Sequence, residues 1–206
     1  SEEAIAEARA GGTTTLSQLD LEAVRASPLF VPALLCTILA AATKSAQLPF
    51  HLWLPTAMEA PTPISAFLHS ATMVKAGVYL VALLAPAFAG VPGWRAGILT
   101  LGVLTMLVGG WRSLVQCDVK LILAYGTVSQ LGFITAVVSF GTADTAMAGM
   151  GMVMAHGLFK ATLFLAVGVI DHQAGTRDIR RLSGVGRMAP KLFTVSVIGA
   201  ASMAGI

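Results

Sequence analysis

The stretch "PTPISAFLHSATMVKAGVYLVALL" (residues 61–84) is apolar along most of its length but contains His69 and Lys75. An α-helix rises about 1.5 Å per residue, so about 20 apolar residues cross the roughly 30 Å hydrocarbon core of a bilayer. A charge at the bilayer centre costs roughly 2.5–3.5 kcal/mol on insertion scales, and the residues that carry one are usually functional. The stretch therefore predicts a membrane-spanning helix whose two basic residues have a functional role.

The composition of the whole chain also predicts a membrane protein. Of its 206 residues, 56% are hydrophobic and 11% are charged, and the mean hydropathy is +0.80. Soluble domains are about 45–50% apolar and about 25% charged. The net charge of +3 is small and no basic stripe contains interleaved aromatic residues, so nucleic acid is not an expected partner. Cys36 and Cys117 have no metal-type spacing, and we expect both to be small buried hydrophobic residues.

Apolar runs divide the chain into a polar N-terminal part and a membrane part. Residues 1–27 predict a polar connection outside the cytoplasm, and residues 28–206 predict part of a transmembrane domain. The six apolar runs cover residues 28–47, 63–89, 94–113, 119–140, 145–170 and 190–206. They predict an all-α, polytopic membrane protein. The chain starts at Ser1 and stops inside an apolar run, so we expect it to be part of a longer polypeptide.

Proline and glycine predict interruptions in some of these helices. Proline fixes φ and lacks a backbone N–H, so it ends or interrupts a helix. The relevant residues are Pro49, Pro55, Pro61 and Pro63, with Gly157 as a weaker point. Discontinuous helices are places where transporters build ion sites, although both residue types also occur in ordinary membrane helices.

Positive charges are unevenly distributed between the loops. The basic residues near the loops after the first, third and fifth runs are Arg112, Lys120, Arg177, Arg180, Arg181, Arg187 and Lys191. The opposite side has Arg9, Arg25 and Arg95. Loops rich in Lys and Arg remain in the cytoplasm. The sequence therefore predicts that the basic loops are cytoplasmic and that residues 1–27 are external.

Basic residues also lie within or beside the apolar runs. They are Lys44, His69, Lys75, His156 and Lys160. A lysine near a helix end can instead extend its amino group to the membrane surface, and this alternative applies most to Lys44. Ser65, His69 and Thr72 are spaced i, i+4, i+7 and share one helix face, while His156 and Lys160 are spaced i, i+4.

These side chains have the chemistry of a proton path. Histidine titrates near neutral pH, and a lysine in apolar surroundings gives up its proton more readily than an exposed one. We therefore expect a relay of lysine and histidine, supported by the hydroxyl groups of Ser65 and Thr72. No redox-cofactor motif and no hydrolase-type nucleophile–base arrangement is present, so we expect neither a cofactor nor enzymatic catalysis. A purely structural scaffold is a poor alternative because of the buried charges.

Three segments resemble one known family, and they occur in that family's order. They are "KSAQLPFHLWLPTAMEAPTPISAFLHSATMVKAGVYL" (44–80), "LVQCDVKLILAYGTVSQLGF" (114–133) and "HGLFKATLFLAVGVIDH" (156–172). They are similar to the antiporter-like subunits shared by Mrp cation/proton antiporters and respiratory complex I. "AMEAPTPISAFLHSATMVKAGVYL" (57–80) and "GVIDHQAGTRDIRRLSG" (168–184) most resemble the A-type subunit of the Mrp antiporter.

The resemblance implies a fold and a function. The chain would be part of a larger helical bundle with inverted repeats, in a bacterial inner membrane. It would belong to a sodium or other cation/proton antiporter, with Na⁺, H⁺, other membrane subunits and the lipid bilayer as partners. The alternative is a proton-pumping membrane subunit of a complex I-like NADH:quinone oxidoreductase or a membrane-bound hydrogenase. Only that assembly would contain flavin and iron–sulfur clusters.

The resemblance also implies roles for single residues. Lys44 would match the lysine of the first half-channel, and His69 and Lys75 would match the relay that leads from it. His156 and Lys160 would match the groups that connect to the second half-channel. Family members often have another histidine at the position of Met152, so the proton path near this residue departs from the family pattern.

Overall fold

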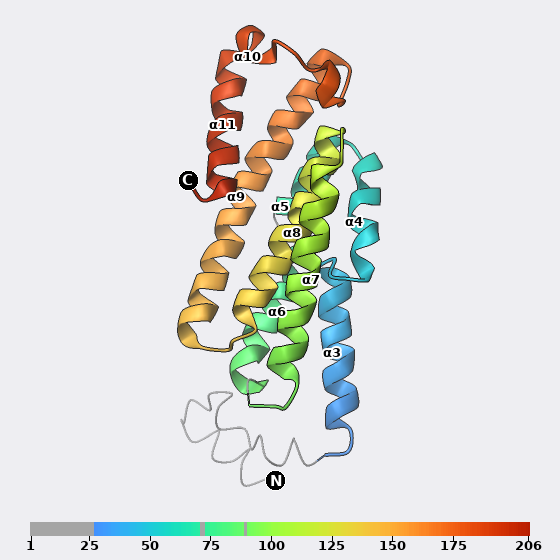
Figure 1. The fold of residues 1–206 in the computed structure, drawn as a ribbon, viewed down its shortest axis with the longest axis vertical. Helices are drawn as coiled ribbons and strands as arrows, with labels where there is room; N and C mark the ends of the chain where they lie inside the picture. Colours follow the sequence, from blue (N-terminus) through green and yellow to red (C-terminus); the bar gives the residue numbers. More distant parts are fainter. Residues whose placement is uncertain (1–26, 71–72, 89) are drawn as a thin grey trace, which may run out of the picture. The chain divides into compact units, whose positions relative to one another are not determined.

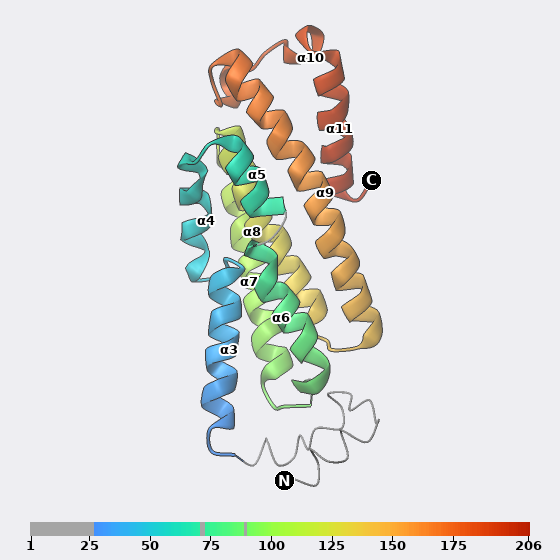
Figure 2. The same cartoon turned by 180° about the vertical axis from the view of Figure 1, so that it is seen from behind.

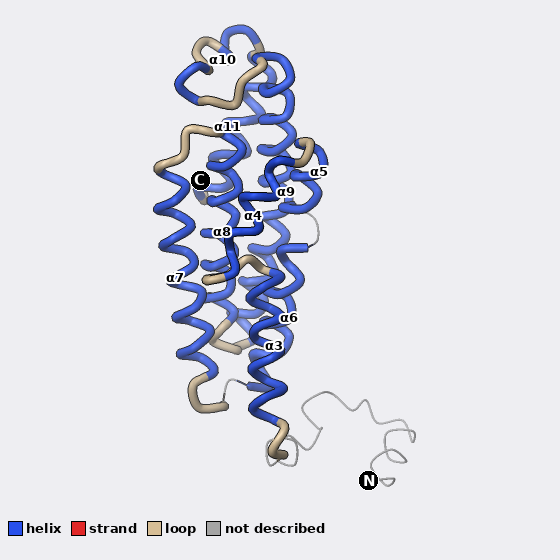
Figure 3. The backbone as a smooth tube through the Cα atoms, turned by 90° about the vertical axis from the view of Figure 1, so that its right-hand side faces the viewer, coloured by secondary structure: helices blue, strands red, loops and turns tan. Residues whose placement is uncertain are grey.

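The computed structural model describes residues 27–70, 73–88 and 90–206. The predicted external connection over residues 1–27 lies almost wholly outside the described residues, as does Thr72 of the predicted relay. The chain divides into two units, residues 1–38 and residues 39–206. In the described residues the secondary structure consists of helices joined by loops (Figure 3), which confirms the all-α prediction.

The long helices lie where the sequence predicted them. They are α3 (Phe30–Lys44), α5 (Thr62–Ser70), α6 (Met73–Phe88), α7 (Trp94–Leu114), α8 (Val119–Val138), α9 (Ala143–Ala174) and α11 (Pro190–Ala204). The predicted run 63–89 corresponds to α5 and α6 together, and α9 extends beyond the predicted run 145–170 at both ends. Figure 1 shows these helices in chain order.

Short helices fill segments that the sequence left as loops. They are η1 (Phe50–Leu52), α4 (Trp53–Thr56), η2 (Ala57–Glu59), η3 (Ile179–Arg181) and α10 (Val185–Met188). Pro55 was predicted to end or interrupt a helix but lies inside α4. The proline is accommodated because the first N–H groups of a helix need no partner within it.

Four described segments are long and apolar enough to cross a membrane. They are Thr62–Phe88, Trp94–Leu114, Val119–Val138 and Ala143–Ala174. The first and last predicted spans correspond to α3 and α11, which are apolar but have 15 residues each. At about 1.5 Å per residue, either helix alone is shorter than a hydrocarbon core.

Local capping determines where α8 and α9 begin. The side chain of Asp118 accepts hydrogen bonds from the backbone N–H groups of Lys120 and Leu121. Thr142 and Thr145 form a capping box at the start of α9. Both arrangements satisfy N–H groups that have no partner within the helix. The helix starts at 119 and 143 therefore follow from short polar sequences between apolar runs.

Helices α7 and α8 pack closely because small residues line their contact. A Cβ atom at Gly132 of α8 would lie 2.5 Å from the backbone nitrogen of Met106 in α7. A Cβ atom at Gly102 of α7 would lie 2.7 Å from the backbone nitrogen of Ala136 in α8. Glycine at these positions allows two membrane helices to approach at the level of their backbones. Figure 1 shows the two helices side by side.

A core of buried side chains joins η2, α5, α8 and α9. It consists of Met58, Ala66, Leu123, Ala124, Phe159, Leu163, Phe164 and Val167. Helix α9 contacts α5, α8, α6 and α11, and Figure 2 shows α5 and α6 following one another along the chain beside it. Many large apolar side chains, such as Met154 and Leu158 of α9, remain exposed. Cys36 and Cys117 are exposed as well, so the prediction that they are buried is wrong.

Candidate functional site

Four of the predicted relay residues are buried together on α5, α6 and α9. His69 and Lys160 are 0% exposed, His156 is 1% exposed and Lys75 is 9% exposed. His156 is close enough to Lys160, Lys75 and His69 to interact electrostatically with all three. No carboxylate of the described residues is among the groups that act on His156. We call these four residues the basic cluster.

Lys160 is held by the backbone of a neighbouring helix. Its Nζ donates a 3.0 Å hydrogen bond to the carbonyl oxygen of Leu123 in α8. The hydroxyl group of Thr127 donates to the same carbonyl oxygen at 2.9 Å. A Cβ atom at Gly126 would lie 3.2 Å from Lys160 Nζ, so the small residue leaves room for the amino group. Lys160 thus links α9 to α8 through a neutral acceptor.

The amino group of Lys75 of α6 also lies against α9 and is also held by a backbone carbonyl oxygen. It donates to the carbonyl oxygen of Ser70. A Cβ atom at Gly157 would lie 2.5 Å from Lys75 Nζ and 3.1 Å from the carbonyl oxygen of Ser70. Gly157 directly follows His156, so the amino group lies against the part of α9 that carries the buried histidine. The glycine therefore makes room for the cation.

The two histidines pack against aromatic rings. The ring centroids of His69 and Phe164 are 4.8 Å apart, and those of His156 and Phe159 are 5.3 Å apart in an edge-to-face arrangement. None of the four ring nitrogens has a hydrogen-bond partner among the described protein groups. Buried polar atoms are normally paired, so both imidazoles are unusual and are candidates for proton exchange.

The structure does not bring every predicted residue into this cluster. Lys44 is the last residue of α3 and is exposed. Ser65 is fully buried, but its hydroxyl group lies 3.4 Å from the carbonyl oxygens of Ala60 and Pro61, at the start of α5. No group of three or more potential metal ligands is found in the described residues.

Lys120 is a buried cation that the sequence analysis counted as a loop charge. It is 2% exposed, and its Nζ donates to the carbonyl oxygens of Met58 at 2.9 Å and Ala60 at 2.5 Å. The carboxylate of Asp118 pairs with Arg177 at 3.3 Å and accepts the backbone N–H of Lys120, so it forms no ion pair with the Lys120 amino group among the described contacts. The position of Lys120 two residues after the helix cap Asp118 was the signal available in the sequence. Without Lys120, six basic residues remain near the loops that were predicted to be cytoplasmic.

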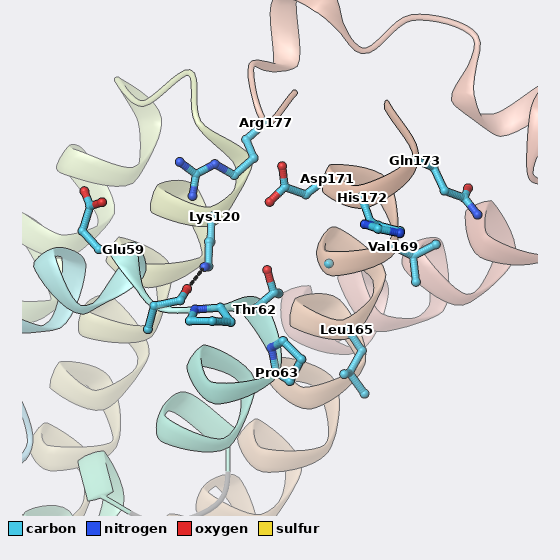
Figure 4. A pocket seen from close by; sticks show the side chains of 13 residues that line it. Glu59, Thr62, Pro63, Lys120, Leu165, Val169, Asp171, His172, Gln173 and Arg177 are labelled. Carbon is cyan, nitrogen blue, oxygen red and sulfur yellow. Dashed lines mark hydrogen bonds between the residues drawn. The ribbon is translucent and has the colours of Figure 1, made fainter. Parts of the chain in front are cut away.

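A pocket of about 860 Å³ lies beside Lys120, between α5 and the last turns of α9. Its polar residues include Glu59, Thr62, Lys120, Asp171 and Arg177, and its apolar wall includes residues of α9 (Figure 4). Figure 4 shows Lys120, Asp171 and Arg177 at the pocket, and its dashed line marks the hydrogen bond that the Lys120 amino group donates to the carbonyl oxygen of Ala60. The pocket therefore contains both signs of charge.

Backbone hydrogen bonds join the loop before α8 to the loop after α9. The backbone N–H of Val119 donates to the carbonyl oxygen of Arg177 at 3.0 Å, and the backbone N–H of Ile179 donates to the carbonyl oxygen of Cys117 at 2.9 Å. Hydrogen bonds from Arg180 lower the pKa of Asp178 to about 2. The Asp178 carboxylate is thus ionised at neutral pH. The loop before α8 and the loop after α9 lie at the same end of the helices.

Comparison with known proteins identifies the family. Residues 8–206 match the transmembrane family described as NADH:quinone oxidoreductase/Mrp antiporter. The chain belongs to this family. The resemblance inferred from the three segments is therefore confirmed, and the polytopic all-helical fold agrees with it.

Several relatives in this family are antiporter subunits. The chain is 50% identical over 201 residues to the A subunit of a Na(+)/H(+) antiporter of Alkalihalophilus pseudofirmus, a match that covers 91% of this chain and 25% of that protein. It is 48% identical over 185 residues to the A/B subunit of a probable K(+)/H(+) antiporter of Rhizobium meliloti, covering 90% of this chain and 18% of that protein. The chain thus spans about a quarter or less of the length of these relatives.

Two solved structures contain similar chains. In the Mrp complex of Dietzia sp. DQ12-45-1b, the matched chain is 38% identical with a TM-score of 0.76, covering 88% of this chain and 22% of that one. In an archaeal membrane-bound sulfane sulfur reductase, the match is 28% identical with a TM-score of 0.76, covering 82% of this chain and 35% of that one. The same fold therefore occurs in an antiporter complex and in a respiratory complex.

Proposed function

We propose that this chain is part of a subunit of a sodium or other monovalent cation/proton antiporter in a bacterial cell membrane. The subunit would be a transporter, with other membrane subunits as its partners. The observation that supports this function best is the buried basic cluster of His69, Lys75, His156 and Lys160, whose two lysines donate to neutral backbone carbonyl oxygens. The antiporter relatives at 48–50% identity support the same function.

The chemistry of the cluster favours proton movement over a fixed charge. Like charges at short range repel strongly where the surroundings are apolar. Four titratable groups enclosed together therefore share protons, and gain or loss at one group affects the others. Carbonyl oxygens of Ser70 and Leu123 can accept a hydrogen bond from a lysine but cannot neutralise its charge. A proton can thus pass between lysine and histidine without first breaking an ion pair between the lysine and a carboxylate.

We also propose the orientation predicted from the loops. Arg177, Arg180, Arg181 and Arg187 lie in or beside the loops after α9, and the backbone pairing of Cys117 with Ile179 keeps the loop after α7 at the same end. Positive charge in short loops favours the cytoplasmic side. In this orientation the pocket beside Lys120 faces the cytoplasm and residues 1–27 are external. Lys44 would have its role in a part of the path outside the basic cluster.

The decisive experiment uses the full-length protein together with its partner subunits in everted membrane vesicles. Addition of Na⁺ or K⁺ should dissipate a respiration-generated ΔpH, and the two cations should be compared at equal concentration. Lys75→Ala should abolish this response at normal abundance of the complex. Lys75→Arg should also transport poorly, because arginine retains its proton. A nearly normal Lys75→Arg variant would show that Lys75 is a fixed counter-charge and would contradict the relay.

A second candidate function is proton pumping in a redox complex, which the similarity to the sulfane sulfur reductase chain favours. Redox-coupled pumping is the weaker candidate, because the chain is 28% identical to the reductase chain but 48–50% identical to the antiporter subunits. The purified complex distinguishes the two functions. Flavin or iron–sulfur absorbance together with the absence of a cation-dependent ΔpH response would support the redox complex and refute antiport.

A further inference from the structure

Lys120 differs from the lysines of the basic cluster in what surrounds its amino group. We propose that Lys120 is a positioning residue whose amino group fixes the start of α5 and thereby the place of His69. This inference rests on the proposed function, because it assigns Lys120 a task in the same proton path. It predicts that a cation which never releases its proton can replace Lys120.

The amino group of Lys120 holds the turn that leads into α5. It donates to the carbonyl oxygens of Met58 and Ala60, which are 62 and 60 residues away in the chain. Ala60 directly follows η2 and is two residues before Thr62, the first residue of α5. The hydroxyl group of Ser65 approaches the same Ala60 carbonyl oxygen at 3.4 Å. One buried amino group therefore fixes the path of the chain into this helix.

The backbone of Lys120 is anchored in turn to the loops at the basic end. Its N–H donates to Asp118 Oδ1 at 2.7 Å, and the other carboxylate oxygen of Asp118 pairs with Arg177 Nε at 3.3 Å. The backbone pairing between Val119 and Arg177 supports the same contact. Three separate segments thus meet at Lys120: the turn before α5, the start of α8 and the loop after α9.

The charges around Lys120 favour a fixed cation over a relay. Asp118 accepts the backbone N–H of Lys120 at 2.7 Å, and Glu59 and Asp171 line the same pocket as Lys120, together with Arg177. No carboxylate of the described residues is among the groups that act on Lys75 or Lys160. Lys120 also makes two hydrogen bonds to carbonyl oxygens, whereas each of those lysines makes one.

The position of α5 matters because the helix carries His69. His69 lies two helical turns after Thr62, where its ring packs against Phe164 of α9. Gly168 of α9 faces the other end of α5, since a Cβ atom there would lie 3.0 Å from Thr62 Cγ2. A helix of this length moves as a rigid body, so loss of its anchor shifts the imidazole relative to α9. Proton transfer between side chains depends steeply on such distances.

The experiment combines hydrogen exchange with transport in the full-length protein, assembled with its partner subunits. The variants are Lys120→Met, which removes the donor, and Lys120→Arg, which keeps a permanent charge. Lys191→Met is the matched control, because Lys191 is an exposed lysine at the start of α11. Lys120→Met should raise amide exchange over residues 57–70 and lower cation-dependent transport, each by about tenfold, as expected for loss of charged hydrogen bonds. Lys120→Arg should restore both, and Lys191→Met should change neither.

Two outcomes would overturn the positioning role. Wild-type exchange over residues 57–70 in Lys120→Met would do so even if transport were lost. Loss of transport in Lys120→Arg with wild-type exchange would show that Lys120 releases its proton and is a relay. Lys120→Gln, which keeps an N–H donor, replaces Lys120→Met if that variant prevents assembly. Amide exchange over residues 57–70 in Lys120→Gln should lie between that of wild type and that expected for complete loss of the donor. Wild-type exchange in Lys120→Gln would equally refute the positioning role. If the wild-type complex shows no cation-dependent response, the proposed function fails, while the exchange data still decide the role of Lys120.

Discussion

The amino group of Lys75 in α6 lies against Gly157 in α9, so that a Cβ atom at position 157 would be 2.5 Å from Lys75 Nζ. The contact joins a buried cation to the helix turn that carries His156 and Lys160. Its two partners are far apart in the sequence and meet only because α6 packs against α9. The space provided by the glycine is therefore part of the basic cluster.

Gly157→Ala should impair transport by displacing the Lys75 amino group. Forcing a methyl group into a filled site costs about 1–3 kcal/mol. We expect a reduced cation-dependent ΔpH response in everted vesicles, with the complex still assembled. Gly151→Ala is the control, because Gly151 lies on the same helix and a Cβ atom there has nothing within 4 Å. Equal activity of the two variants would contradict the close contact.

Gly132→Ala should destabilise the pairing of α7 with α8. A Cβ atom at this position would lie 2.5 Å from the backbone of Met106, and backbone atoms cannot turn aside as a flexible side chain can. The cost should be about 1–3 kcal/mol or more. Thermal unfolding of the purified complex and its abundance in membranes measure the effect. Gly97→Ala in α7, which has open space around its Cβ, should leave both unchanged.

Transport should fall more when the Lys160 side chain is truncated than when it is replaced by another titratable group. Lys160→Ala leaves the Leu123 carbonyl oxygen without its donor from α9 and removes a proton carrier. Loss of a hydrogen bond to a charged group costs about 1.5–3 kcal/mol. Transport should fall by about tenfold or more, whereas Lys160→His should retain part of it. An active Lys160→Ala variant at normal abundance would remove Lys160 from the path.

The loop after α9 should be accessible from the cytoplasm. A single cysteine at position 177, in a background without Cys36 and Cys117, tests this orientation, since both native cysteines are exposed. A membrane-impermeant thiol reagent should label it in everted vesicles and leave it unlabelled in intact cells. Labelling from outside intact cells would reverse the proposed topology. A single cysteine at position 95, near the start of α7 and at the other end of that helix from the loop before α8, should show the opposite labelling pattern.

The pairing of Asp178 with Arg180 should not respond to mild acidification. Arg180 lowers the pKa of Asp178 from 3.8 to about 2. A carboxyl group whose pKa is lowered on folding stabilises the fold above its unfolded pKa, and that contribution is lost as the pH falls through the folded pKa. Hydrogen exchange over residues 178–182, corrected for the intrinsic rate, should therefore be constant between about pH 7 and pH 5. A change in that range would show that another group titrates in this loop.

The sequence by itself determined the helices and the identity of the candidate relay. Apolar runs of membrane-spanning length predicted the long helices, because a helix in lipid must satisfy its own backbone polar groups and cover itself with apolar side chains. The i, i+4 spacing of His156 and Lys160 placed both side chains on one face of α9. These are local properties, so residues close in the chain were enough to predict them.

Only the tertiary structure separated the lysines from one another. In the sequence, Lys44, Lys75, Lys120 and Lys160 are each a cation in or beside an apolar run. In the fold, Lys44 is exposed, Lys75 and Lys160 lie in the basic cluster, and Lys120 holds the turn before α5. The carbonyl oxygens and glycines around the three buried lysines come largely from other helices and from the turn before α5. These contacts depend on which helices pack together and at what height, and the sequence of a single helix does not contain that information.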